Sequence, residues 1–285
     1  MNPLSINVAG INIDLSILSN DRLDFFWKDP FFRSHLPIVN ERASKKASKK
    51  VLRVGKWGNE IDFISFPFRV ISKIMPELLK EEKILLHASG LLYKESFIIL
   101  IGSSGFGKST ITGELLTKGC KLIGDDKIVL SGKNKIICGN PIISFRQNNL
   151  AQNLSSLLNL EIKKSKFTDK YYLEPQNINT ARNFIYKKIF IIEVRLNNSK
   201  FICSKLKPND VAFNLFSDVL ATTRGRESFS VFPPIIPPIS NCSNGSLKKA
   251  LMNINIITST NKNNLYYMEG IKSIISQEII KLIKI

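Results

Sequence analysis

A glycine-rich segment between an apolar run and a predicted helix constrains the fold of this chain more than any other feature. Residues 102–110 read Gly-Ser-Ser-Gly-Phe-Gly-Lys-Ser-Thr and match the pattern G-x-x-x-x-G-K-[ST]. Residues 97–101 predict a strand and residues 109–118 a helix. In such a unit the glycines let backbone N–H groups point at a polyphosphate, and the helix N-terminus adds partial positive charge. The sequence therefore predicts a site for nucleotide phosphates.

The residues predicted to bind the phosphates form one continuous run. They are Gly102, Ser103, Ser104, Gly105, Phe106, Gly107, Lys108, Ser109 and Thr110. Lys108 should reach the β- and γ-phosphates and take part in catalysis, while the Ser109 hydroxyl should contact Mg²⁺. We therefore expect ATP and Mg²⁺ at this loop. The chain has neither an N-K-x-D nor a D-x-x-G motif, which disfavours a GTPase.

Two adjacent carboxylates follow the next predicted strand, residues 120–124. Asp125 and Asp126 come soon after the loop in the sequence, and like charges side by side favour a metal ion or a lysine between them. A functional pair is one interpretation. The other is an aspartate-rich turn in which Asp126 and Lys127 form a surface ion pair.

A histidine lies near the end of the apolar run at residues 84–92, which predicts a strand. A turn at residues 93–96 would return the chain antiparallel into the strand that leads to the loop. This arrangement would place His87 beside the loop. A structural role for His87 stays open.

Three segments in this order resemble one enzyme family. The segments His87-Ala88-Ser89-Gly90, the glycine-rich loop, and the strand ending in Asp125-Asp126 resemble HPr kinase/phosphorylase and its shorter relatives associated with peptide modification. The segment at residues 138–146, which ends in Arg146, is similar to one in those relatives. The resemblance covers about residues 85–146. Residues 191–195 are similar to a further family motif, but the glycine-rich segment that follows it in the family is missing here. The resemblance therefore extends to the kinase core and not to phosphorylase activity or to HPr as substrate.

The resemblance implies a fold and a division of roles. The fold would be α/β, with a mixed sheet and a P-loop of the PEP-carboxykinase-like type, preceded by a small β-rich N-terminal part. Asp125 would be the catalytic base and His87 a further catalytic residue. Apart from the resemblance, we expect Asp126 to hold Mg²⁺ together with Ser109, since an ion there would relieve the repulsion between the two aspartates.

The expected activity is a kinase reaction on a hydroxyl. The acceptor class that we favour is a serine of a peptide or small protein. A nucleotide-binding switch without transfer chemistry, a small-molecule kinase and a nucleic-acid kinase remain alternatives. A kinase needs a base near its acceptor, whereas a switch does not.

Composition narrows the partners. The 285 residues carry a net charge of +18, which favours polyanions, but the joint richness in Lys, Asn and Ile is typical of AT-rich coding, so nucleic acid is disfavoured. The four cysteines are widely spaced and predict neither a zinc site nor a disulfide framework. No run approaches the length of a membrane span, so a cytoplasmic protein is expected. Homo-oligomers stay open.

We expect a β-rich N-terminal part at residues 1–66 and, as the resemblance implies, a P-loop kinase domain at residues 67–285, or one continuous domain. Helices are predicted at residues 67–80, 150–160, 208–220 and 271–282, and strands at residues 6–15, 183–196 and 253–258. Residues 163–169 should be a polar loop, residues 41–50 a solvated basic segment, and residues 232–238 an extended linker. The aromatic residues between 25 and 32 should pack in a core.

Overall fold

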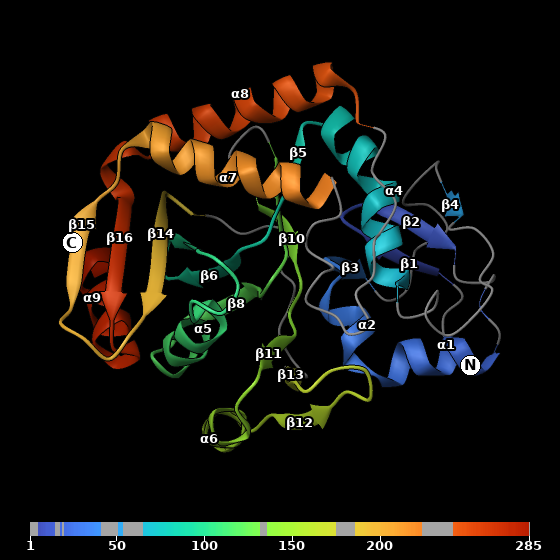
Figure 1. Ribbon diagram of the computed structural model, residues 1–285, viewed down its shortest axis with the longest axis horizontal. Coiled ribbons are helices and arrows are strands. Elements are labelled where there is room, and N and C mark those ends of the chain that lie inside the picture. Colours follow the sequence, from blue (N-terminus) through green and yellow to red (C-terminus); the bar gives the residue numbers. More distant parts are fainter. Residues whose placement is uncertain are drawn as a thin grey trace.

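A computed structural model of the chain describes residues 5–14, 18, 20–40, 51–53, 65–131, 136–174, 186–223 and 242–284. Its centre is a six-stranded sheet with the order β15-β16-β14-β7-β6-β8 (Figure 1). The strands are β6 (Ser89–Tyr93), β7 (Ser96–Ile101), β8 (Lys121–Gly124), β14 (Lys188–Leu196), β15 (Ile202–Lys205) and β16 (Leu265–Gly270). β7, β14 and β16 are parallel, and β8 shares their direction because β6 is antiparallel to both β7 and β8. The α/β class with a mixed sheet is therefore confirmed.

Helices cover both faces of this sheet. In β7, Ile98 and Leu100 pack with helices α5 (Lys108–Thr117) and α9 (Lys272–Lys284). Ile99 and Ile101 face the other way, where the core includes residues of α4 (Phe66–Lys80), α7 (Pro208–Thr223) and α8 (Asn244–Thr260). A strand buried on both faces reads as a continuous apolar run, which explains residues 97–101.

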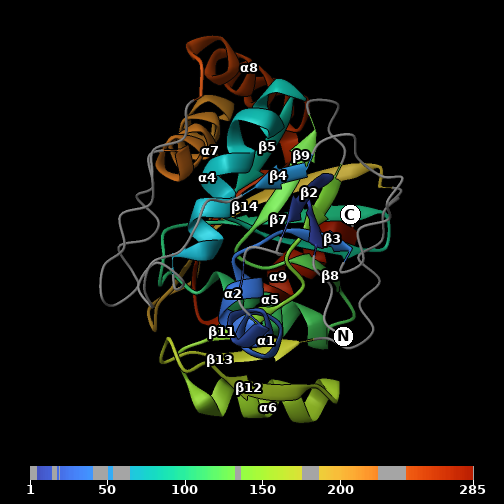
Figure 2. The ribbon, with the colours of Figure 1, turned by 90° about the vertical axis from the view of Figure 1, so that its right-hand side faces the viewer.

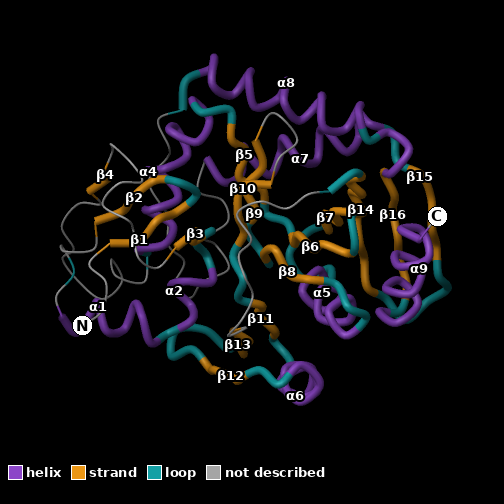
Figure 3. Tube along the Cα trace, turned by 180° about the vertical axis from the view of Figure 1, so that it is seen from behind, coloured by secondary structure: helices purple, strands orange, loops and turns teal. Residues whose placement is uncertain are grey.

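The N-terminal part forms a second sheet with the order β3-β1-β2-β4. Its strands are β1 (Ser5–Val8), β2 (Ile11–Asp14), β3 (Ile38–Asn40) and β4 (Val51–Arg53). β1 and β2 form an antiparallel hairpin, so the strand structure predicted within residues 6–15 is confirmed. This sheet and the β15–β16 edge lie at opposite ends of the molecule (Figures 1 and 3).

Strands and turns do not account for the whole N-terminal part, because two helices also form there. They are α1 (Asn20–Lys28) and α2 (Pro30–Ser34). The Asp29 side chain caps α2 by accepting the Phe31 N–H at 2.9 Å, and Pro30 fits the first helical turn. Phe26, Phe31 and Phe32 are fully buried in one core with residues of α4 and α7, as predicted for the aromatic residues.

Two three-stranded sheets complete the described fold. One has the order β10-β9-β5, with β5 (Lys83–Leu86), β9 (Ile128–Ser131) and β10 (Ile136–Gly139). The other has the order β11-β13-β12, with β11 (Ile143–Phe145), β12 (Glu161–Lys164) and β13 (Tyr171–Glu174), and packs on α6 (Asn148–Leu158). Figure 2 shows α6 and β12 at the end of the molecule opposite α8. β12 includes residues 163 and 164, so the predicted polar loop begins later than expected.

Two local predictions need correction. The single strand at residues 84–92 is two strands in different sheets, because the chain bends at His87. The prediction of a strand at residues 253–258 is wrong, because these residues lie within α8. Ile254 and Ile257 face the core at helical spacing, and Ser243 caps the helix. The next strand along the chain is β16, which lies between β15 and β14 in the central sheet and comes after a short 3-10 turn at Lys262–Asn264.

Other predictions hold. α4 spans Phe66–Lys80 and continues through Pro76. The C-terminal helix buries Ile275, Ile279 and Ile283.

The basic segment at residues 41–50 and the proline-rich segment at residues 232–238 lie outside the described residues. No helix in the described part of the chain is both long and apolar enough to cross a bilayer.

Candidate active site

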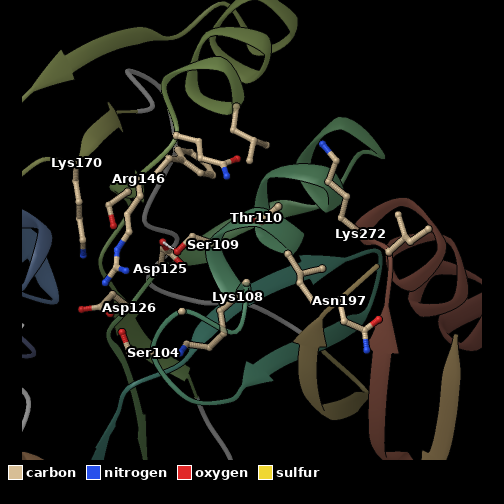
Figure 4. Close-up of a pocket in the computed structure, with 18 of the residues that line it drawn as sticks. Ser104, Lys108, Ser109, Thr110, Asp125, Asp126, Arg146, Lys170, Asn197 and Lys272 are labelled. Carbon is tan, nitrogen blue, oxygen red and sulfur yellow. Dashed lines mark hydrogen bonds between the residues drawn. The ribbon is translucent and has the colours of Figure 1, made fainter. Parts of the chain in front are cut away.

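The carboxyl ends of the co-directional strands meet at one edge of the central sheet and surround a cavity of about 680 Å³. The glycine-rich loop (residues 102–107) follows β7, and Asp125 and Asp126 follow β8. Asn197 follows β14, and Lys272 begins α9 after β16. Figure 4 shows Lys108 between the aspartates on one side of this cavity and Asn197 with Lys272 on the other. In open α/β sheets, such an edge is where ligands bind.

The glycine-rich loop rests on the end of β14. A Cβ atom added to Gly107, whose φ is +94°, would lie 2.2 Å from Leu196 Cδ1, and one added to Gly102 would lie 2.8 Å from the Val194 carbonyl oxygen. The Leu196 N–H donates to the Phe106 carbonyl at 2.9 Å. Only glycine fits at positions 102 and 107, so the packing against β14 fixes the loop's path.

Lys108 reaches back over this loop. Its ammonium donates to the Gly102 carbonyl at 2.6 Å and to the Ser103 carbonyl at 3.4 Å, and the residue is only 7% exposed. Burial lowers the pKa of Lys108. Within the described residues no carboxylate lies at ion-pair distance from it. A buried ammonium without a carboxylate partner is unfavourable, and an anion in the loop would compensate it.

Asp125 is closed off from solvent and bound by two serines. It is 1% exposed, Ser89 Oγ donates to its Oδ1 at 2.5 Å, and Ser109 Oγ donates to its Oδ2 at 2.8 Å. Burial raises the pKa of Asp125, and the two hydrogen bonds partly oppose that rise. The structure thus pairs Ser109 with Asp125, whereas the sequence led us to group Ser109 with Asp126.

Asp126 has a different environment. His87 Nε2 lies 2.8 Å from its Oδ1, Lys127 Nζ lies 3.7 Å from its Oδ2, and 32% of its side chain is exposed. Burial acts to raise the pKa of Asp126, but Lys127 and His87 outweigh it and hold the pKa well below its usual range. The Lys127 side chain is 4% exposed, so this is not a surface ion pair. His87 lies beside the aspartates and lines the same cavity as the loop.

A close backbone approach holds the aspartate turn in place. A Cβ atom on Gly124 would lie 2.5 Å from Gly139 Cα, so the ends of β8 and β10 touch. The Asp125 N–H donates to the Asn140 carbonyl at 2.6 Å, and the Asn140 side chain donates to the Ser34 carbonyl in the N-terminal part. Asp126 takes a left-handed backbone conformation there, with φ +66°. The N-terminal part therefore supports the site.

Two cations near the aspartates were not among the predicted site residues. Arg146 follows β11 and Lys170 precedes β13, and both line the cavity. Figure 4 shows their side chains directed toward the side of the cavity where Asp126 lies. Arg146 ends the segment that resembles the shorter kinase relatives. Lys170 lies in a polar stretch that gives no sequence signal of its own.

The side-chain oxygen atoms beside the loop suit a hard cation such as Mg²⁺ that takes most of its ligands from water and phosphate. Among the described residues, no group of three or more His, Cys, Asp or Glu side chains could hold a metal alone. The oxygen atoms of Ser109 and Asp125 lie together beside the loop. Mg²⁺ usually takes one or two protein oxygens and completes its octahedron with water and phosphate, so these residues fit it.

Comparison with known proteins adds no family assignment. No protein-family model matches this sequence. A search of curated proteins also finds no match.

Proposed function

We propose that this chain is an ATP-dependent kinase with a P-loop fold of the PEP-carboxykinase-like type. It transfers the γ-phosphoryl group to a hydroxyl, and a serine of a peptide or small protein is the acceptor class that we favour. One observation carries the proposal. Beside a glycine-rich loop with a buried lysine, one aspartate is closed and bound to Ser109, while its neighbour contacts His87 and is partly exposed at the cavity. Two carboxylates in such different environments are typical of two different catalytic roles.

Ser109 and Asp125 form the metal side of the proposed site. Ser109 would ligate Mg²⁺ directly, and Asp125, held by Ser89, would ligate it or orient its water molecules. When bound, Mg²⁺ neutralises charge on the β- and γ-phosphate oxygens. Lys108 would exchange the Gly102 and Ser103 carbonyls for phosphate oxygens. This assignment gives Asp125 the metal-binding role that was predicted for Asp126 from the sequence.

Asp126 then faces the acceptor. The acceptor oxygen bonds to the γ-phosphorus, the bond from that phosphorus to the β–γ bridging oxygen breaks, and ADP leaves. The hydroxyl proton passes to the Asp126 carboxylate. Because its pKa is low, Asp126 is a weak base that acts mainly by orienting the hydroxyl, which suits a loose transition state. The His87 contact fixes its orientation, and Arg146 with Lys170 adds positive charge on that side.

A transfer assay tests this function. The protein is incubated with ATP, Mg²⁺ and a pool of synthetic serine peptides, and mass spectrometry follows peptide phosphorylation while ADP is measured in parallel. We expect phosphopeptide and ADP in equal amounts, and neither from Lys108→Ala. ATP binding without any phosphorylated product, or ADP formed with free phosphate only, would contradict a kinase and favour a nucleotide switch or a hydrolase.

A further inference from the structure

A second cavity, of about 650 Å³, meets the first at the aspartate turn. The two cavities share His87, Ser104, Asp126 and Lys170. The first cavity is lined by the later loop residues and extends to Asn197 and Lys272. The second is lined by the earlier loop residues and extends under α7. Each cavity thus reaches Asp126 along a different path.

Two cavities that meet at one carboxylate suit a reaction with two substrates. In phosphoryl transfer, the attacking and leaving oxygens lie roughly in line on opposite sides of the phosphorus. The first cavity holds the helix N-terminus and Ser109, so it suits the nucleotide. The second cavity is then the path by which a hydroxyl can approach Asp126 without passing the nucleotide.

The far wall of the second cavity carries carboxylates. Glu193, near the end of β14, accepts a hydrogen bond from Asn214 Nδ2 at 3.2 Å, and Asp218 lines the same wall on α7. In the described part of the chain, no lysine, arginine or histidine forms an ion pair with Glu193. These carboxylates are notable in a chain with a net charge of +18, whose overall field attracts anions.

The positive groups of the second cavity lie toward the aspartate turn. Lys127 already contacts Asp126, and Lys170 belongs to both cavities. Both histidines of the sequence also line this cavity. Burial lowers the pKa of His35 to about 4, so His35 adds no charge at neutral pH. Glu193 therefore gives the α7 wall, where Asp218 also lies, a carboxylate that forms no ion pair with a described cation, while the end at the aspartate turn carries both signs of charge.

We propose that the second cavity is the acceptor site, and that Glu193 and Asp218 select a peptide segment with a lysine or arginine near its hydroxyl. The hydroxyl would lie at Asp126 and the cationic side chain at the α7 wall. This inference rests on the proposed kinase function and adds the acceptor's charge and its route of entry.

The first test measures binding rather than turnover. Two fluorescent peptides differ only in whether lysines or glutamates flank a central serine, and their affinity for the full chain is measured with ADP and Mg²⁺ at physiological salt. We expect the lysine peptide to bind about tenfold more tightly, the scale of two partly exposed charge pairs. Glu193→Gln with Asp218→Asn should remove that preference. Glu95→Gln with Glu161→Gln removes two exposed charges outside both cavities and should retain it.

The result that overturns the inference is equal binding, or tighter binding of the acidic peptide, by the parent chain. Retention of the lysine preference in the Glu193→Gln, Asp218→Asn variant would also overturn it. Circular dichroism and the unfolding temperature of each variant show whether it is folded, so a folding defect is distinguished from lost recognition.

The second test separates this inference from the kinase function. Ser217 lines only the second cavity and Asn198 only the first. Ser217→Trp should abolish phosphorylation of the lysine peptide and leave ATP affinity unchanged, whereas Asn198→Trp should weaken ATP binding. If transfer occurs and Ser217→Trp does not affect it, the acceptor site is wrong and the kinase stands. If the lysine peptide binds as predicted but is never phosphorylated, the kinase function is wrong while the peptide site stands.

Discussion

Ser109 donates a hydrogen bond of 2.8 Å to Asp125, while His87 contacts Asp126 at 2.8 Å. The two adjacent carboxylates thus belong to different parts of the site. One is tied to the residue expected to meet the metal, and the other faces the open cavity. This separation leads to distinct predictions for the two asparagine variants.

Asp125→Asn should weaken the Mg²⁺ dependence of nucleotide binding. The amide keeps the shape of the side chain but removes the charge that would hold the metal beside Ser109. Calorimetry with ATP, with and without Mg²⁺, measures the effect. We expect Mg²⁺ to improve the parent's affinity markedly and the variant's affinity little. An unchanged Mg²⁺ effect would remove Asp125 from the metal side.

Lys108→Ala should reduce ATP affinity by roughly 10- to 100-fold, the scale of a lost hydrogen bond between charged groups. Lys121→Ala, an exposed lysine at the start of β8, is the matched control and should bind like the parent. Because burial already disfavours the charge on Lys108, the alanine variant should unfold at a temperature similar to the parent's. Parent-like ATP affinity would contradict the phosphate assignment.

Comparing Gly107→Ala with Gly105→Ala separates two contributions to the loss of stability: backbone strain at positive φ, and a steric clash with Leu196. Both glycines have positive φ, and a left-handed backbone costs an alanine about 1–2 kcal/mol. Only at Gly107 does the new Cβ meet Leu196, at 2.2 Å, which should cost about 1–3 kcal/mol more. Chemical unfolding of the two variants tests the difference. Leu196→Ala should recover part of the Gly107→Ala loss, and no recovery would mean that β14 does not fix the loop.

Ser89→Ala should shift the pH dependence of Mg²⁺-assisted nucleotide binding. Loss of the Ser89 hydrogen bond destabilises ionised Asp125, so its pKa, already raised by burial, rises further. The acid limb of binding should therefore move to higher pH. The folded chain also holds this proton more tightly than the unfolded chain, so the free energy of unfolding falls as pH rises through this window, and more so in Ser89→Ala. In an Asp125→Asn background, Ser89→Ala should shift neither profile.

The local parts of the site could be predicted from the sequence. The strand, loop and helix around Lys108 follow from patterns within about twenty residues, the scale on which such signals act. The turn at residues 93–96 was enough to place His87 near the loop, since β6 and β7 pair antiparallel. The strand predicted at residues 253–258 failed because Ile-rich sequence favours strands locally, whereas burial at helical spacing decides the structure of α8.

The division of roles between the aspartates could not be predicted in this way. It depends on the contact between Gly124 and Gly139, and on Ser89, whose hydroxyl reaches Asp125 from the neighbouring strand β6. Lys170 and Glu193 come to the cavities from separate sheets. Such contacts form only when segments that are distant in the sequence pack together, and the periodicity of the sequence does not predict them.

The most direct test of the account is the Asp126→Asn variant in a single-turnover transfer assay. ATP labelled at the γ-phosphate is bound with Mg²⁺, its affinity is measured, and the label transferred to a serine peptide is followed in the same sample. Asp126→Asn should bind ATP with Mg²⁺ as the parent does, because Ser109, Lys108 and Asp125 are intact, while transfer falls by roughly 10²-fold, the scale of lost general acid–base help. Transfer at the parent rate, or a loss of Mg²⁺-dependent binding without a slower transfer step, would contradict the assignment of Asp126 to the acceptor.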